Sequence, residues 1–380
     1  MLTDVGPANC RPFLLCLLDI WRFSFIIFRL WLVKMDIELF NYELPEGYIA
    51  YFPAARRDAS KLMVLDRTSG QTSHHSFRDI TDFLKAGDAL VINNTKVFKA
   101  RFLARRGSGG KVEVFLLEET KFEGKNCWKV LTHPTRRVKE GETIYLDGEE
   151  AFQLIKKYED GKSLIKFKSR TEAERIIKRY GHMPLPVYIH RPDRKSDEDR
   201  YQTVYAHPKK AKSVAAPTAG LHFTKSILQK IKDMGVKIIP ITLHVGLGTF
   251  KTVRAVNIGD HIVDPEYAEI SKSAVRSINK VRRDGGRIFA VGTTSVRTLE
   301  SAEIADNEVM PFSGFVDLYI RPGYQFKIVD HLITNFHLPK SSLIILVSAF
   351  AGREKILKAY SEAIQNKYRF YSYGDCMLIL

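Results

Sequence analysis

The sequence predicts an α/β protein that carries a second, smaller domain built as an antiparallel β-barrel. The first observation is that strand-like apolar runs alternate with helical patterns before residue 93 and again beyond residue 171. The second is that short strand-like runs follow one another between about residues 97 and 167, separated by glycines. Closely spaced strands with glycine turns are typical of a small barrel. The barrel is therefore either inserted into the α/β domain or appended beside it.

The α/β domain is expected to comprise residues 35–87 and 172–380. In its first part, the apolar run 62–67 predicts a strand that ends at a Ser-Gly turn, and residues 77–84 have helical spacing. The second part predicts alternating helices and strands at 224–234, 236–243, 272–284, 287–291 and 295–305.

The barrel domain is expected at residues 88–171. This segment begins with a buried strand at 89–92 and a polar turn at 93–95. Glycine-containing turns then separate the strands predicted at 101–105, 111–117, 128–131, 142–146 and 164–168.

Composition favours a folded protein with a polyanionic partner. The chain has 380 residues, enough for two domains, and its hydrophobic content of 45% excludes a disordered protein. The formal net charge of +16 indicates nucleic acid as the first candidate partner and an anionic membrane surface as the second. The alternative is a basic protein whose lysines are only solvated. The four cysteines show no CxxC or zinc spacing, so we expect free thiols, a reducing compartment and a cytoplasmic location.

The first 34 residues differ from the rest of the chain. Residues 13–33 are apolar and long enough to cross a bilayer, but Asp19, Arg22 and Arg29 interrupt them. The early basic residues and the cleavage site of a signal peptide are missing. We therefore expect Met35 to be the working start, residues 1–34 to lie outside the fold, and no stable membrane association. An amphipathic membrane anchor is the alternative.

The densest chemical signal lies in two stretches, residues 213–224 and 243–250. Each places one imidazole, His222 or His244, among hydroxyls and small residues. Histidine is the side chain best suited to move protons near neutral pH, and small residues let the backbone approach a ligand closely. The two stretches flank one predicted helix and are expected to form two walls of a pocket. The alternative is two tight turns with core histidines.

Residues 287–300 predict a strand, a turn and a helix start. The turn contains Thr293, Thr294 and Ser295, and Arg297 follows in the first helical turn. Free backbone N–H groups at a helix start favour an anion, and an arginine adds donors. The alternative is an ordinary helix cap with a surface arginine. Glycine-rich dinucleotide and P-loop motifs are not found in the sequence.

Residues 330–342 place Thr334, Asn335 and His337 shortly before a Pro/Ser helix start. If the stretch is extended, alternation puts Asn335 and His337 on one side. The functional interpretation is a polar wall that positions a ligand. The alternative is a turn held by its own asparagine and histidine.

Three stretches mix arginines with aromatic residues, at 191–205, 321–324 and 367–373. This combination suits bases that have left a stack in a loop or a single strand. Each stretch taken alone is equally consistent with a solvated turn.

With these motifs in place, the chain from residue 35 to 380 resembles the S-adenosylmethionine:tRNA ribosyltransferase-isomerase family of bacterial queuosine synthesis. The resemblance is carried by nine stretches in the family's order. They are residues 40–45, 57–60, 184–186, 200–206, 213–224, 243–250, 285–302, 334–339 and 368–375. The family implies an α/β main domain with an inserted six-stranded antiparallel β-barrel.

The chain also departs from the family pattern at three places. Asn-Asn-Thr-Lys at 93–96 replaces the common Asn-Asp-Thr-Arg, and Phe315-Val316 replaces a frequent Trp-Thr. Asp264 stands where the family commonly has a second histidine. Because of this last change, we place no catalytic residue within 261–266.

The resemblance implies an unusual reaction. S-adenosylmethionine would donate its ribosyl part to a 7-aminomethyl-7-deazaguanine in the tRNA anticodon stem-loop. The products would be adenine, methionine and tRNA bearing epoxyqueuosine. S-adenosylmethionine would be a substrate, so no cofactor and no metal are expected, and we expect a monomer. The rivals are an S-adenosylmethionine-dependent RNA methyltransferase and a non-enzymatic tRNA-binding protein.

The reaction needs a base, an acid, polar groups for the methionine part and contacts to a splayed base. Three histidines are the catalytic candidates: His222, His244 and His337. The substrate-binding candidates are Thr218, Gly220, Gly246, Thr249, Thr293, Thr294, Ser295, Arg297 and Asn335. The tRNA-binding candidates are Arg200, Tyr201, Tyr205 and Arg321. The sequence does not rank the histidines as acid or base.

Overall fold

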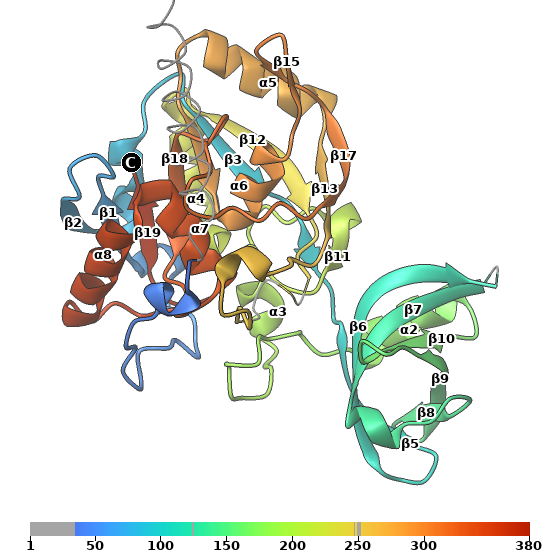
Figure 1. The fold of residues 1–380 in the computed structure, drawn as a ribbon. Helices are drawn as coiled ribbons and strands as arrows, with labels where there is room; N and C mark the ends of the chain where they lie inside the picture. Colours follow the sequence, from blue (N-terminus) through green and yellow to red (C-terminus); the bar gives the residue numbers. More distant parts are fainter. Residues whose placement is uncertain (1–34, 124, 247, 249–251) are drawn as a thin grey trace, which may run out of the picture. The chain divides into compact units, whose positions relative to one another are not determined.

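The structure is a computed structural model that describes residues 35–380 apart from residues 124, 247 and 249–251 (Figure 1). The expected leader, residues 1–34, and the candidate Thr249 lie outside the described residues. The described chain divides into a small unit, residues 35–39 with 253–261, and a large unit, residues 40–252 with 262–380. In the part of the chain that is described, no helix combines the length and apolar character needed to cross a bilayer.

The small unit is held by backbone pairing between its two segments. An isolated antiparallel bridge joins Asp36 to Asn257, and the backbone N–H of Ile37 donates to the carbonyl of Val256 at 2.8 Å. A short 3₁₀ helix, Ile258–Asp260, follows.

The large unit contains a nine-stranded sheet (Figure 1). Its strands in chain order are β1 (Lys61–Leu65), β2 (Thr72–Ser76), β3 (Ala89–Asn93), β12 (Lys237–Leu243), β13 (Glu266–Ile270), β14 (Ile288–Val291), β17 (Phe312–Val316), β18 (His331–Asn335) and β19 (Cys376–Ile379). Their spatial order is β17-β13-β12-β3-β14-β18-β19-β1-β2. The four central strands β12, β3, β14 and β18 are mutually parallel. Their carboxyl ends therefore meet at one edge.

Apolar sequence explains why the central strands lie inside. Every residue of β3 and β14 is buried, as expected for parallel strands that are covered on both faces. Side chains of β3 and β14 pack against Phe223 and against Ile227 and Ile231 of helix α4 (Lys225–Asp233). The other α-helices described outside the barrel are α3 (Asp197–Arg200), α5 (Lys272–Arg283), α6 (Thr293–Glu300), α7 (Ser342–Ala351) and α8 (Arg353–Gln365).

Polar caps start the helices where the sequence places them. The side chains of Thr224, Ser271 and Ser341 accept hydrogen bonds from backbone N–H groups three residues on, at the starts of α4, α5 and α7. The helix predicted at 295–305 is shorter than expected, because α6 ends at Glu300. A two-stranded hairpin of β15 (Ile304–Ala305) and β16 (Glu308–Val309) follows it.

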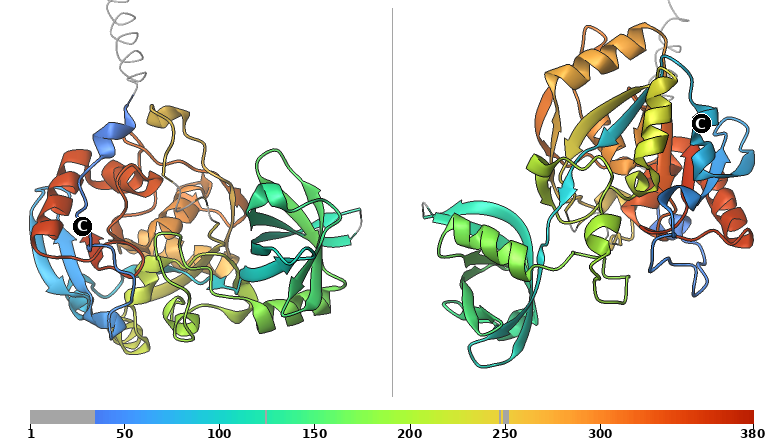
Figure 2. Two further views of the ribbon diagram at one scale, coloured as in Figure 1. Left: turned by 90° about the horizontal axis from the view of Figure 1, so that it is seen from below. Right: turned by 180° about the vertical axis from the view of Figure 1, so that it is seen from behind.

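The barrel consists of six antiparallel strands that close on themselves, which confirms the prediction (Figure 2). Its strands are β5 (Arg101–Arg106), β6 (Lys111–Phe122), β7 (Lys125–His133), β8 (Thr143–Leu146), β9 (Glu149–Lys157) and β10 (Lys162–Lys166). Inward-facing residues such as Phe102, Val114 and Leu154 form its core. Helix α2 (Arg170–Tyr180) contributes Ala173 and Ile176 to the same core. Strand β9 was not among the predicted strands.

The predicted start of the barrel at residue 88 is too early. Strand β3 pairs with β12 and β14 in the nine-stranded sheet, and the short β4 (Lys96–Val97) pairs with β11 (Ala211–Ser213). The first barrel strand begins at Arg101. The physical reason is that β3 is entirely apolar up to its last residue and needs cover on both faces, which the interior of the sheet provides.

The chain leaves the sheet after β3, builds the barrel, and returns to the sheet at β12 beside β3. The barrel is therefore inserted into the α/β unit. The next parallel strand, β14, lies on the other side of β3. The connections thus diverge at the carboxyl end of β3, and ligands of open α/β sheets bind at such switch points.

Candidate active site at the carboxyl edge of the parallel strands

Polar residues gather where the parallel strands end. Asn93 ends β3 and is fully buried. Its Nδ2 donates to the carbonyl of Leu243 at 3.0 Å and to the hydroxyl of Thr294 at 3.2 Å. Its Oδ1 accepts from the backbone N–H of Leu243 and of Thr95, both at 3.1 Å. Asn93 therefore ties the end of β12 to the start of α6.

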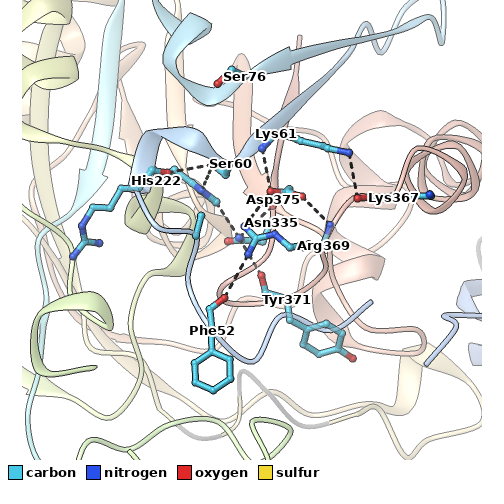
Figure 3. A network of polar contacts seen from close by, with 12 residues as sticks. Phe52, Ser60, Lys61, Ser76, His222, Asn335, Lys367, Arg369, Tyr371 and Asp375 are labelled. Atoms are coloured by element: carbon cyan, nitrogen blue, oxygen red, sulfur yellow. Dashed lines mark hydrogen bonds and ion pairs between the residues drawn. The ribbon is translucent and has the colours of Figure 1, made fainter. Parts of the chain in front are cut away.

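At the end of β18, Asn335 is the centre of a buried polar network (Figure 3). The hydroxyl of Thr218 donates to its Oδ1 at 2.8 Å. Its Nδ2 donates to the carbonyl of Tyr371 at 3.2 Å and to Nε2 of His222 at 3.1 Å. Because a carbonyl only accepts, Nδ2 must face Tyr371, and the orientation of the amide is fixed.

This orientation determines the state of His222. Since Nε2 accepts from Asn335, the proton lies on Nδ1, which donates to Oγ of Ser60 at 2.7 Å. The hydroxyl of Ser60 is in turn 3.3 Å from the carbonyl of Arg57. Burial lowers the pKa of His222 to about 3, with smaller effects from Arg369 and Arg57. A buried neutral ring with both nitrogens engaged favours a positioning role for His222 over proton transfer.

Asp375 joins this network to the neighbouring strands. Its carboxylate accepts from the backbone N–H of Lys61 at 3.0 Å and of Arg369 at 2.8 Å. The guanidinium of Arg369 pairs with the same carboxylate at 3.3 Å and reaches the carbonyl of Phe52 at 3.4 Å (Figure 3). The carboxylate of Asp375 thus links the start of β1 to the loop before β19.

A small pocket of about 30 Å³ opens beside this network. Thr218, Asn335, His337, Tyr188 and Tyr371 are among its lining residues. Nε2 of His337 lies 2.8 Å from the hydroxyl of Thr334, and burial lowers the pKa of His337 to about 3. Within the described residues, its other ring nitrogen has no hydrogen-bond partner. The pocket is therefore lined by neutral groups, in part polar and in part apolar, the latter including Phe336, Leu338 and Leu343.

His244 follows β12 and has a different environment. Its Nδ1 lies 2.8 Å from Oγ1 of Thr95, and that hydroxyl lies 3.4 Å from the carbonyl of Lys210. In the tautomer that lets this hydroxyl donate to the carbonyl of Lys210, Nδ1–H donates to the hydroxyl and the lone pair of Nε2 is available. Nε2 has no partner in the part of the chain that the structure describes. Burial, then Lys212 and Lys210, lower the pKa of His244 to about 4, so the ring is neutral at pH 7.

The structure thus places the catalytic candidates along one edge of the sheet, in two separate groups. His222, His337, Thr218 and Asn335 surround the end of β18. His244 lies at the end of β12, three strand positions away, which corresponds to about 14 Å. The end of β3 and the start of α6 lie between the two groups.

At the predicted anion site, the start of α6, the structure pairs several side chains within the protein. Arg297 is 7% exposed and forms an ion pair with Glu266, while its other nitrogens donate to backbone carbonyls of residues 316 and 318. The hydroxyl of Ser295 donates to the carbonyl of Val291, and that of Thr294 accepts from Asn93. Because α6 is buried on all sides, Thr294, Ser295 and Arg297 have partners within the protein, and Arg297 is not a free cation for a ligand. Thr293, also buried, stays a prediction.

Glu266 lies in the stretch 261–266, where we expected no catalytic residue. Its Oε1 accepts from the backbone N–H of Gly246 at 2.6 Å, while Oε2 contacts Arg297. The buried pair therefore holds the first glycine of the glycine-rich stretch after β12. Gly246 itself contributes a backbone donor to this carboxylate.

The two tyrosines among the predicted tRNA contacts have different environments. Tyr201 is fully buried and packs edge-on against Tyr373, with ring centroids 5.8 Å apart. The hydroxyl of Tyr205 is buried against Gly220, where an added Cβ would lie 2.0 Å from it. Gly220 is thus required for packing. Tyr201 has no exposed ring for stacking, whereas Tyr205 is only half-buried and stays a prediction. Tyr201 directly follows the short helix α3, and residue type alone did not reveal that its ring is buried.

The two arginines among the tRNA candidates differ. Arg200 donates to the carbonyls of Ala54 and Ala55, so it holds a loop of its own chain. Arg321 is exposed and has no hydrogen-bond partner among the described residues, so it stays a prediction. Among the described residues, no group of three His, Cys, Asp or Glu side chains is placed to hold a metal ion.

The buried histidines predict a loss of stability in acid. Burial lowers the folded-state pKa of His222 and His337 to about 3 and that of His331 to about 4, whereas an unfolded histidine titrates near about 6.5. The unfolded chain therefore binds more protons below this pH, and the free energy of unfolding falls from pH 6.5 toward pH 3. We expect a loss of at most about 2 kcal/mol per buried histidine between pH 7.5 and pH 5.

Urea unfolding at both pH values measures this effect. His331→Phe supplies the control, because His331 packs on Phe289 and lies outside the polar network. This variant should lose less stability between pH 7.5 and pH 5 than the wild type. Equal stability of the wild type at the two pH values would contradict the prediction.

Comparisons with known proteins identify the family of this chain. The family model described as a queuosine biosynthesis protein matches residues 37–379. A protein of Caldanaerobacter subterraneus subsp. tengcongensis named S-adenosylmethionine:tRNA ribosyltransferase-isomerase is 48% identical over 343 residues, 90% of this chain and 98% of that protein. One of the same name from Halothermothrix orenii is 47% identical over 91% of this chain and its own full length.

A solved structure extends the comparison to the fold. The crystal structure of S-adenosylmethionine tRNA ribosyltransferase from Thermotoga maritima is similar with a TM-score of 0.52 and 37% sequence identity. The match covers 90% of this chain and 100% of that one. The family model matches residues 37–379, and the two relatives are 48% and 47% identical over about nine tenths of the chain. The chain therefore belongs to the queuosine biosynthesis protein family.

Proposed function

We propose that this chain transfers and isomerises the ribosyl part of S-adenosylmethionine onto a 7-aminomethyl-7-deazaguanine in the anticodon loop of a tRNA. The products are tRNA bearing epoxyqueuosine, adenine and methionine. Relatives that share almost the whole chain carry the name of this activity. The observation that carries the proposal in this structure is the neutral His244 with an available Nε2 at the switch point of the sheet.

The first chemical requirement is the removal of a proton from the carbon beside the sulfonium. His244 meets it, because its lone pair is free and Thr95 fixes its tautomer. The ring takes the proton, and the electron pair of the C–H bond stays on the carbon next to the positive sulfur.

The second requirement is a proton for the departing adenine. Because burial lowers the pKa of His244 to about 4, the imidazolium formed in the first step is more acidic than an exposed one. It gives its proton to adenine as the bond between adenine and the ribose breaks, and adenine keeps the electron pair of that bond. The same proton therefore passes from the carbon to His244 and on to adenine. This route needs no second acid in the site, and S-adenosylmethionine is consumed as a substrate without a further cofactor or metal.

The residues around the end of β18 bind the substrate and do not transfer protons. Thr218, Asn335 and His337 line the pocket, and all three are neutral at pH 7. His222 and Ser60 hold Asn335 in one orientation from behind. We assign this group to the polar part of the S-adenosylmethionine substrate.

The charge of the chain suits the second substrate. A formal net charge of +16 favours association with the phosphates of tRNA, and the exposed Arg321 is a candidate contact. Because tRNA is the acceptor, we place the reaction in the cytoplasm.

Product analysis tests the proposed function. The full chain is incubated with S-adenosylmethionine and tRNA that carries the aminomethyl base, and small products are separated by chromatography. We expect adenine and methionine in equal amounts, and neither product with tRNA that lacks the aminomethyl group. S-adenosylhomocysteine would indicate a methyltransferase, and intact S-adenosylmethionine a non-enzymatic RNA-binding protein. Either result would contradict the proposal.

A further inference from the structure

We propose that His244, Tyr267 and Phe315, called here the aromatic row, form the surface on which an unpaired base of the RNA substrate stacks. The inference rests on the proposed function, because it takes RNA as the acceptor. It adds a binding surface that the tRNA candidates drawn from the sequence did not include.

Strand register places the three rings in line. Tyr267 of β13 lies opposite Phe315 of β17, and the backbone N–H of His244 donates to the carbonyl of Tyr267 at 2.9 Å. Side chains directly opposite each other on neighbouring strands point to the same face. The rings of His244 and Tyr267 are nearly parallel, at 17°, with centroids 5.8 Å apart. Phe315 meets Tyr267 edge-on at 6.0 Å.

The row is rigid and open at one end. The hydroxyl of Tyr267 is held by Ser313 at 2.8 Å, which anchors the tip of the central side chain. Phe315 is 64% exposed, although it lies in a strand of the sheet. Covering a large exposed ring with a binding partner is favourable, because it removes apolar area from water.

The charges beside the row favour a nucleic acid over an apolar protein surface. Lys210 and Lys212 lie close enough to His244 to act on its ring. Lys210 is paired with Glu269, but Lys212 has no ion-pair partner in the part of the chain that the structure describes. Aromatic rings next to a cation are the combination that binds single-stranded nucleic acid, since a base stacks while a phosphate meets the charge.

The position of the row also suits the reaction. An enzyme that modifies a base must take it out of its stack, and the extruded base then stacks on protein side chains. One end of the aromatic row is His244, the proposed proton carrier. A base stacked on this row therefore lies next to the reacting group.

The test is the affinity of the full chain for an anticodon stem-loop RNA that carries 2-aminopurine, placed in turn at each loop position. Stacking quenches 2-aminopurine, so the wild type is expected to quench it at one or two positions. Phe315→Ala is expected to abolish this quenching and to weaken RNA binding by about 5- to 150-fold. Its affinity for S-adenosylmethionine and its melting temperature should stay at wild-type values.

Matched variants separate stacking from simple apolar contact. Phe315→Trp keeps an aromatic face and should retain quenching, whereas Phe315→Leu keeps apolar bulk and should lose it. Ile262→Ala removes another exposed apolar side chain, 87% exposed, and should bind RNA as the wild type does. If Phe315→Leu binds and quenches like the wild type, the aromatic row is not a stacking surface.

The same experiment distinguishes a failure of the stacking surface from a failure of the proposed function. Wild-type binding and quenching by Phe315→Ala would overturn the stacking surface and leave the proposed function intact. A wild-type chain that binds no anticodon stem-loop would overturn the proposed function and the stacking surface with it.

Discussion

Replacing His244 with alanine is expected to lower kcat by about 100- to 10,000-fold, the range typical of a lost acid–base group. The reason is that Nε2 of His244 is unpartnered among the described residues, while the ring is neutral at pH 7 and held by Thr95. The ring is only partly buried, so the fold should remain intact. Adenine release at saturating substrates measures kcat, and thermal unfolding checks the fold.

Thr95 supplies the matched control. Thr95→Ser keeps the hydroxyl that holds Nδ1 of His244 and should retain most of kcat. Thr95→Val has a similar shape without the hydroxyl, so the ring loses its fixed tautomer and kcat should fall. Wild-type turnover by His244→Ala would show that the base assignment is wrong.

Replacing Asn335 with leucine is expected to be strongly destabilising, by about 2–5 kcal/mol. The side chains have similar volume, but leucine leaves Nε2 of His222 and the hydroxyl of Thr218 without their buried partner. The KM for S-adenosylmethionine should also rise, because Asn335 lines the pocket. Urea unfolding gives the free energy, and kinetics at low temperature, where the variant stays folded, give KM.

The same substitution at an exposed position is the control for this change. Asn366 follows α8 and is exposed, and its side-chain amide donates to the backbone carbonyl of Glu362, one turn earlier. Asn366→Leu should change the free energy of unfolding by less than about 1 kcal/mol. Equal stability of the Asn335 and Asn366 variants would indicate that the buried network does not support the site.

The fold was largely predictable because its elements have strong local patterns. Alternating elements beyond residue 171 indicated the α/β unit, and glycine-separated strands indicated the barrel. The wrong predictions concern strands whose partners lie far away in the sequence. Strand β3 looks the same locally whether it joins the barrel or the sheet, and only its neighbours β12 and β14 place it.

The site was predictable as a set of candidates but not as a geometry. His222 and Asn335 were both chosen from their stretches, yet their contact spans 113 positions and no local pattern reports it. Ser60 and Asp375 were missed as site residues, although the stretches that contain them were among those that carried the family resemblance. Their roles depend on the hydrogen-bond partners that the fold brings to them.

Burial explains the candidates that the structure corrects. Arg297 was expected to face an anion, but a guanidinium on a fully buried helix needs an internal partner, which Glu266 provides. Tyr201 was chosen because charged residues surround it, and a charged stretch gives no sign that one ring turns inward. Phe315, by contrast, is an apolar residue in a strand whose exposure no local pattern predicts.

The central claim is that S-adenosylmethionine lies along the carboxyl edge of β12, β3, β14 and β18. A crystal structure of the full chain with S-adenosylmethionine bound measures this directly. We expect the carbon beside the sulfonium within about 3.5 Å of Nε2 of His244, and a polar end of the ligand in the pocket beside Asn335. A ligand bound within the barrel, or one whose sulfonium lies far from His244, would contradict the account.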